Sequence, residues 1–164
     1  MMKKGLLAIS VLVALLAIGS QASADPIGPD CNSCFGNVYT LSFTEVSPTN
    51  FTIKYELDTA TTGLPATFFV GQIAFKVTNN SGAFTGVSLL GTDAPGTWGV
   101  ASIGGLNNSG CDSGPAGFVC SSDPTFSALT DGSKYTWLFD VNVTSASDWK
   151  LAPFDALVKA HFGP

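Results

Sequence analysis

The sequence contains no arginine and only one histidine, His161, and charged residues make up just 12% of it. Nucleic-acid-binding domains neutralise phosphates with clustered arginine and lysine, so we expect no nucleic-acid partner. A serine-hydrolase triad needs a histidine base that a third group holds in place. Because His161 stands three residues from the end, on the polar register of its segment, we interpret it as an exposed strand residue rather than a catalytic base.

Long apolar runs are also scarce, and the clearest one lies at the N-terminus. Leu6 to Ile18 spans 13 residues, whereas a membrane-spanning helix needs about 20. Two lysines precede this run, and an Ala-Ser-Ala cleavage site follows it at residues 22–24, as in a secretory signal peptide. We predict that residues 1–24 are a signal peptide, that the mature chain begins at Asp25, and that it has no membrane span.

The predicted mature chain, residues 25–164, is long enough for one domain with a sizeable core. It keeps five lysines and all 12 acidic residues, a net charge of −7. This charge disfavours binding to phosphate backbones and to anionic lipid, and it is typical of a protein that stays in solution outside the cell. We therefore predict a secreted, extracellular protein.

No part of the mature chain has a long helical period, and alternation of apolar and polar residues appears instead, which predicts strands. The predicted strands are 39–43, 51–57, 73–77, 84–90, 98–103, 135–143 and 151–162. The last could also form a short helix over 155–160, but its alternation favours a strand. Seven or eight strands with one wet face predict an all-β fold, an antiparallel two-sheet sandwich or jelly roll over residues 25–164.

Residues 104–131 differ from the rest, with little periodicity and with Gly-Pro and Asp-Pro dipeptides. We interpret them as a long irregular segment joined across Cys111 and Cys120. Segments of this length are often functional or else need a constraint.

Four cysteines in an exported domain indicate two disulfides, and three pairings are open. Spacing favours Cys31–Cys34 and Cys111–Cys120. A redox role for the Cys-x-x-Cys pair would require a helix N-terminus to lower a thiol pKa, but a strand-like stretch follows Cys34. A zinc site would require the two pairs to meet, and the second pair is spaced too widely. We therefore expect structural disulfides and no metal or other cofactor.

The acidic residues give little indication of an enzyme. Two suitably separated carboxylates would suffice for a glycosidase, so the count alone does not exclude one. Most acids, however, stand in turn contexts such as Asp93-Ala94-Pro95-Gly96 and Asp131-Gly132, where turn formation explains them. We expect no catalytic residues.

Exposed tryptophan rings can stack on sugars, so each of the three tryptophans is considered as a ligand contact. Trp137 lies on an alternating apolar face and is predicted to be core. Trp98 and Trp149 are less constrained and are our candidate ligand contacts. The competing interpretation is that each closes the edge of the core with its N–H directed outward.

Several short motifs follow one another in a recognisable order. They are Cys-x-x-Cys-x-Gly leading to Tyr39-Thr40-Leu41, Ala74-Phe75-Lys76-Val77, Gly96-Thr97-Trp98, Gly117-Phe118-Val119-Cys120, Tyr135 to Asp140, and Val158-Lys159-Ala160. In this order the chain resembles the PEP-CTERM family of exported bacterial proteins. The resemblance implies export from a Gram-negative bacterium, processing by an exosortase, and a role among extracellular polymeric substances such as biofilm matrix. It implies no catalytic residues.

A Pro-Glu-Pro motif, an apolar helix and a basic end define the family. This sequence ends at His161-Phe162-Gly163-Pro164 without them. We expect either that the tail is missing from this sequence or that the protein is released without sorting. The expected function is that of a non-enzymatic extracellular protein associated with biofilm matrix, exopolysaccharide or other matrix proteins. The alternative is a carbohydrate-binding module that uses Trp98, Trp149 and polar residues of 104–131.

Overall fold

The computed structural model describes residues 25–27, 37–59, 69–77, 84–99, 101–107, 110–112, 117–144 and 156–163. These residues form ten strands and no helix. In chain order the strands are β1 (Asp25–Ile27), β2 (Val38–Ser47), β3 (Asn50–Asp58), β4 (Phe69–Val77), β5 (Phe84–Thr92), β6 (Ser102–Asn107), β7 (Gly110–Asp112), β8 (Phe118–Ser122), β9 (Lys134–Val143) and β10 (Ala156–Gly163). Accordingly, the described part of the chain contains no helix that could cross a membrane.

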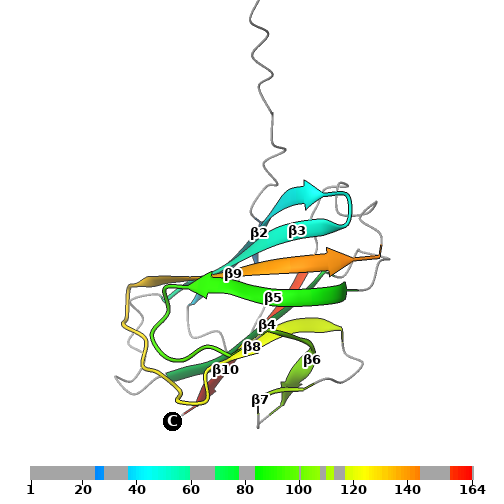
Figure 1. Ribbon diagram of the computed structural model, residues 1–164. Coiled ribbons are helices and arrows are strands. Elements are labelled where there is room, and N and C mark those ends of the chain that lie inside the picture. Colours follow the sequence, from blue (N-terminus) through cyan, green and yellow to red (C-terminus); the bar gives the residue numbers. More distant parts are fainter. Residues whose placement is uncertain are drawn as a thin grey trace, which may run out of the picture.

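The strands form two five-stranded antiparallel sheets. Sheet A has the order β1-β2-β3-β9-β5, and sheet B has the order β10-β4-β8-β6-β7. Figure 1 shows β2, β3, β9 and β5 following one another from the top of the molecule, with β4, β8 and β10 behind and below them. The prediction of an all-β fold with antiparallel sheets is confirmed.

The inner faces of the two sheets share one core. On β3, Phe51, Ile53, Tyr55 and Leu57 are fully buried, and the intervening residues are partly exposed. Side chains from sheet B join them, and the Phe75 ring of β4 packs edge-on against the Phe139 ring of β9 with centroids 5.2 Å apart. Each fully buried side chain of this size contributes about 1.5–3 kcal/mol. The apolar residues of the alternating pattern are therefore the ones that face this core.

Most of the predicted strands are present. The predictions over 39–43, 51–57, 73–77, 84–90 and 135–143 are confirmed by β2, β3, β4, β5 and β9. At the C-terminal end the strand prediction is also confirmed over Ala156–Gly163, which pairs with β4, while residues 151–155 lie outside the described residues.

The strand predicted over 98–103 is wrong in its first half. Trp98 and Gly99 belong to a loop, and the strand begins only at Ser102. Gly96 has a φ of 108°, and the Gly99 N–H donates to the carbonyl oxygen of Ser122 at 2.7 Å. This loop follows contacts with the end of β8 rather than a regular strand pairing.

The prediction of an irregular segment over 104–131 is also wrong, because it contains the end of β6, all of β7 and all of β8. β8 is the middle strand of sheet B, and Phe118, Val119, Cys120 and Ser121 are all buried. A strand buried on both faces has no polar side to alternate with its apolar side. Its sequence therefore lacks the period that identified the other strands.

Candidate functional site

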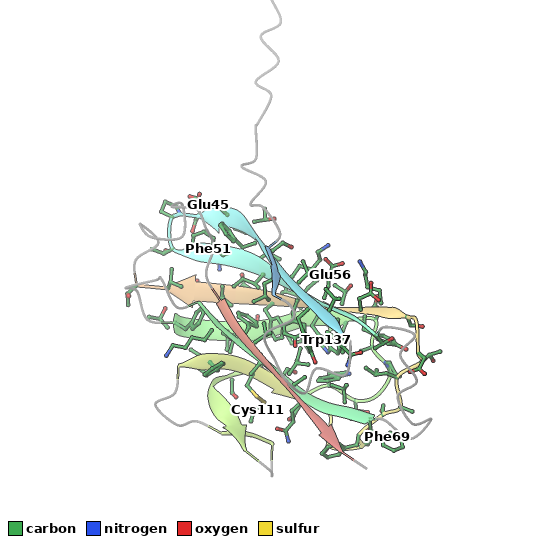
Figure 2. The ribbon with its side chains drawn as sticks, turned by 180° about the vertical axis from the view of Figure 1, so that it is seen from behind. Glu45, Phe51, Glu56, Phe69, Cys111 and Trp137 are labelled. Atoms are coloured by element: carbon green, nitrogen blue, oxygen red, sulfur yellow. A yellow bond between two sulfur atoms is a disulfide. The ribbon has the colours of Figure 1, made fainter. Side chains whose placement is uncertain are left out.

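Trp98, one of the two candidate ligand contacts, lies at one end of the core. Its ring packs edge-on against Trp137, with centroids 4.9 Å apart and an interplanar angle of 75°. Its Nε1–H donates to the carbonyl oxygen of Pro95 at 3.0 Å. The ring is half-buried and closes the core beside the fully buried Trp137, which Figure 2 labels between the sheets. The N–H is thus directed back to its own loop, and only part of the ring faces solvent.

The other candidate contact, Trp149, lies outside the described residues, as do Cys31 and Cys34. The structure therefore brings Trp98 together with the core but does not relate it to Trp149. The ligand-contact prediction for both tryptophans stays a prediction, and so does the disulfide between Cys31 and Cys34.

The loop that carries Trp98 is fastened to a buried carboxylate that the sequence analysis did not single out. Asp123 is fully buried and stands directly after β8. Its Oδ1 accepts hydrogen bonds from the Thr97 N–H at 3.2 Å and from both the N–H and the hydroxyl of Thr125. Its Oδ2 accepts a hydrogen bond from the Ser127 N–H at 3.0 Å. The Asp123 carboxylate therefore joins two loops, 93–99 and 123–127.

These hydrogen bonds determine the protonation of Asp123. Burial alone would raise the pKa of this carboxyl group, because it disfavours the charged form. The side-chain and backbone donors of Thr125 and Ser127 outweigh burial and lower the pKa to about 2. A general base or acid works best with a pKa near the working pH. Asp123 is therefore suited to holding the loops in place and poorly suited to proton transfer.

Two glycines make room for this corner of the molecule. A Cβ at Gly96 would collide with the Asp123 carboxylate and the Ser127 hydroxyl, and the φ of Gly96 is positive. A Cβ at Gly71 would collide with the Phe126 ring. Phe126 itself has a φ of 48°, a left-handed conformation that is costly for a bulky residue. The Phe126 ring is thus held across the backbone of β4 by a strained turn that starts at Asp123.

The predicted disulfide between Cys111 and Cys120 is present, and it has an unusual position. It joins β7 to β8, although β6 lies between these strands in sheet B. Strands two places apart in a flat sheet are separated by about 9.5 Å, but the two Cα atoms are 5.7 Å apart. The hairpin of β6 and β7 must therefore curl out of the sheet plane and over the outer face of β8. Figure 2 shows Cys111 on this hairpin, at the end of the molecule away from Glu45.

A second, smaller core lies where the curled hairpin packs against sheet B. Ala74, Phe118 and Cys120 are buried together on the outer side of sheet B, and Cys111 packs against them. The ammonium group of Lys76 lies 5.9 Å from the centroid of the Phe118 ring, a cation–π distance. At this end both faces of sheet B are thus buried. The disulfide holds in place the β6–β7 hairpin, which covers part of the outer face.

Sheet A has the opposite character on its outer face. β2, β3 and β9 place nine outward side chains in three cross-strand rows, which we call the polar grid. The rows are Thr40–Glu56–Thr136, Ser42–Lys54–Leu138 and Thr44–Thr52–Asp140. All nine are at least partly exposed, and eight of them are polar or charged. The grid is therefore a broad surface of hydroxyl and charged groups, and it contains no aromatic ring.

Hydrogen bonds at one edge order this surface. The Asn50 Nδ2 donates to Asp140 Oδ1 at 2.8 Å and to Asn142 Oδ1 at 3.1 Å. Within the grid, Lys54 and Glu56 form an ion pair with an N–O distance of 3.1 Å. The Lys54 side chain is the more exposed of the two and Glu56 is largely buried, so the Lys54 ammonium group is the one that can exchange partners with a ligand at low cost.

A metal centre finds no support in the described ranges, where no three His, Cys, Asp or Glu side chains come together. Sequence reasoning missed Asp123 because Asp-Pro was interpreted only as a feature of an irregular segment. The pattern Asp123-x-Thr125-x-Ser127 was a usable signal, since Asp side chains commonly accept hydrogen bonds from residues two positions on. The partner Thr97 lies 26 residues earlier and had no such signal.

No protein-family model, curated protein or solved structure matches this chain.

Proposed function

We propose that this chain is an exported, non-enzymatic β-sandwich protein, jelly-roll-like in its architecture, that associates with extracellular polysaccharide or other matrix components. The polar grid of sheet A is the observation that carries this proposal. Hydroxyl, ammonium and carboxylate groups are donors and acceptors that pair with the hydroxyl groups of a polysaccharide. The grid presents them on three adjoining strands whose inner faces pack into the core, so the surface is held rigidly.

Export rests on the signal-peptide pattern of residues 1–24 and on the acidic mature sequence. A second disulfide, Cys31–Cys34, belongs to the same proposal, since oxidising compartments favour disulfides. The resemblance to PEP-CTERM proteins supports the matrix role. The net charge of −7 disfavours polyanionic partners, so neutral polysaccharide is the better ligand class.

Three of the described carboxylates have structural partners, which supports the proposal of a non-enzymatic role. Asp123 is held ionised by its four hydrogen bonds. Asp93 accepts a hydrogen bond from the Thr136 N–H at 2.6 Å, and Asp140 accepts one from Asn50. Each of these acids has a structural partner that accounts for its position.

The alternative is a carbohydrate-binding module with Trp98 as its stacking ring. It is favoured by one observation, namely that Trp98 stays partly exposed on a loop that Asp123 keeps rigid. Against it stand the contact of the ring with Trp137 and the use of its N–H by Pro95.

Sedimentation of the purified exported protein with insoluble cellulose or chitin tests both proposals. We expect binding that Thr52→Lys weakens, because the new side chain covers one row of the grid. Trp98→Phe should retain binding. Thr130→Lys, at an exposed loop position away from the grid, is the matched control. Binding lost in Trp98→Phe but kept in Thr52→Lys would support the module instead, and no sedimentation with any polysaccharide would contradict both.

A further inference from the structure

Sheet A ends at β1 on one side and at β5 on the other, and β5 contains no charged residue. Among the described strands it pairs only with β9, so every second residue directs its backbone N–H and C=O away from the sheet. Proteins commonly protect such edges with charged residues. The other three end strands each contain one, namely Asp25 in β1, Asp112 in β7 and Lys159 in β10. The sequence of β5, FTGVSLLGT, contains none.

Apolar side chains on β5 are incompletely covered on both faces. On the inner face, Val87 and Leu89 pack against the core but stay partly exposed, whereas the residues paired with them on β9, Val141 and Phe139, are fully buried. Elsewhere on the strand, Leu90 is 59% exposed, and Leu138 of β9, which pairs with the next residue, is 37% exposed. The sheet thus ends on apolar surface that one further strand would cover.

Irregularities in the pairing with β9 limit the length of this edge. The register shifts between Phe84 and Gly86 and again between Leu89 and Gly91. Such bulges twist an edge and shorten the pairing that it can offer. The regular window is therefore Gly86–Leu89, with Leu90 projecting at its end.

We propose that a second copy of this chain binds here, with β5 paired antiparallel to β5 about a two-fold axis at Ser88. This register places Val87 opposite Leu89 of the second copy, so two apolar pairs form on the inner face. It places the exposed Leu90 opposite Gly86, whose missing side chain leaves room for it. Ser88 faces Ser88 at the centre, where two hydroxyl groups can form a hydrogen bond. The window is thus complementary to itself, as a two-fold interface requires.

Charge selects this edge over the others for self-association. Two copies with a net charge of −7 each repel one another, and an interface that places like charges opposite each other is destabilised. The β5 window adds no like-charged pair. Its short length predicts a dimer that dissociates on dilution rather than a permanent one.

Analytical ultracentrifugation of the purified exported protein over a range of concentrations tests this proposal. We expect a reversible monomer–dimer equilibrium. Leu90→Lys should weaken the dimer by about tenfold or more, since each copy loses an apolar contact and gains a charge at the edge. Val46→Lys is the matched control, because Val46 is an exposed apolar residue on β2, far from β5 in the same sheet. It should leave the equilibrium unchanged.

A cross-link tests the register. Paired residues on adjacent antiparallel strands have Cα atoms about 4.5–5.5 Å apart, within the range of a disulfide. Ser88→Cys should therefore form a covalent dimer on mild oxidation, and Val46→Cys should not. A protein that is monomeric at every concentration, or a dimer that Val46→Lys disrupts while Leu90→Lys does not, would overturn the proposal. A dimer without the Ser88→Cys cross-link would overturn the register.

Discussion

Tyr39 packs edge-on against Tyr55 on the neighbouring strand, with ring centroids 6.1 Å apart and an interplanar angle of 71°. Both side chains are buried in the core. Burial raises the pKa of Tyr39 to about 12, although the side chain of Asn37 partly opposes this effect. Burial also raises the pKa of Tyr55 well above its usual value, and the neighbouring Tyr39 adds to the shift. The core is therefore built around two phenols that resist ionisation.

Alkaline pH should unfold the protein through these tyrosines. An unfolded tyrosine ionises near pH 10, whereas Tyr39 in the folded protein ionises near 12. The stability linked to them is fully present below pH 10 and is lost as the pH rises beyond it, by about 1.4 kcal/mol per pH unit for each tyrosine. Urea unfolding at several pH values measures this slope, and Tyr39→Phe should reduce it. Tyrosinate absorbance near pH 10 that is smaller in the folded Tyr39→Phe variant than in the folded parent protein would contradict the prediction.

Asp123→Ala should destabilise the protein by about 2–3 kcal/mol, because it leaves the N–H groups of Thr97, Thr125 and Ser127 without their acceptor. Asp131→Ala, an exposed turn position, is the matched control and should cost little. The folded pKa of Asp123 is lower than the unfolded one, so its contribution is present above pH 4 and is lost as the pH falls towards 2. Urea unfolding at neutral and acid pH checks both statements, and an Asp123→Ala variant as stable as Asp131→Ala would refute them.

Removal of the described disulfide should loosen one end of sheet B before the rest of the molecule. Cys111→Ala combined with Cys120→Ala should lower the free energy of unfolding by about 3 kcal/mol for a loop of this size. Because the disulfide holds β7 over β8, the amide of Phe118 should exchange hydrogen faster, while the amide of Ile53 on β3 should show only the global change. Equal acceleration at both amides would show that the curled hairpin is not a separate unit.

Trp98 should contribute mainly to stability. Trp98→Ala removes the edge-on contact with Trp137 and should cost about 3 kcal/mol. Trp98→Phe keeps a ring in place but removes the hydrogen bond to Pro95, so it should cost about 1 kcal/mol. Thermal unfolding and near-ultraviolet circular dichroism measure these effects. A stable Trp98→Ala protein would mean that the ring serves a surface role.

The sequence was sufficient to predict strands with one wet face and insufficient for strands without one. On β3, Phe51 and Ile53 alternate with partly exposed residues, so period two is visible. On β8, Val119 faces the main core while Phe118 and Cys120 face the second core, and no polar residue alternates with them. Its burial depends on a hairpin that curls out of the sheet, which no local pattern encodes.

The site shows the same division. Spacing alone favoured the pairing of Cys111 with Cys120, and an alternating face placed Trp137 in the core. Asp123 was not singled out from the sequence, because its hydrogen bond to Thr97 depends on how two distant loops meet. Residue type indicates that an aspartate can accept hydrogen bonds, but the fold decides which donors reach it.

The corner around Asp123 has a consequence for the ancestry of this chain. Gly96 cannot gain a side chain while the Asp123 carboxylate occupies the space that a Cβ atom would need. Gly71 cannot gain one while the Phe126 ring lies against it. Neither glycine is therefore free to mutate while its partner stays, and each is tied to a residue distant in the sequence. In homologous chains, Gly71 should be kept wherever an aromatic residue stands at 126, and Gly96 wherever an aspartate stands at 123. Such paired inheritance would identify relatives whose overall sequences have diverged.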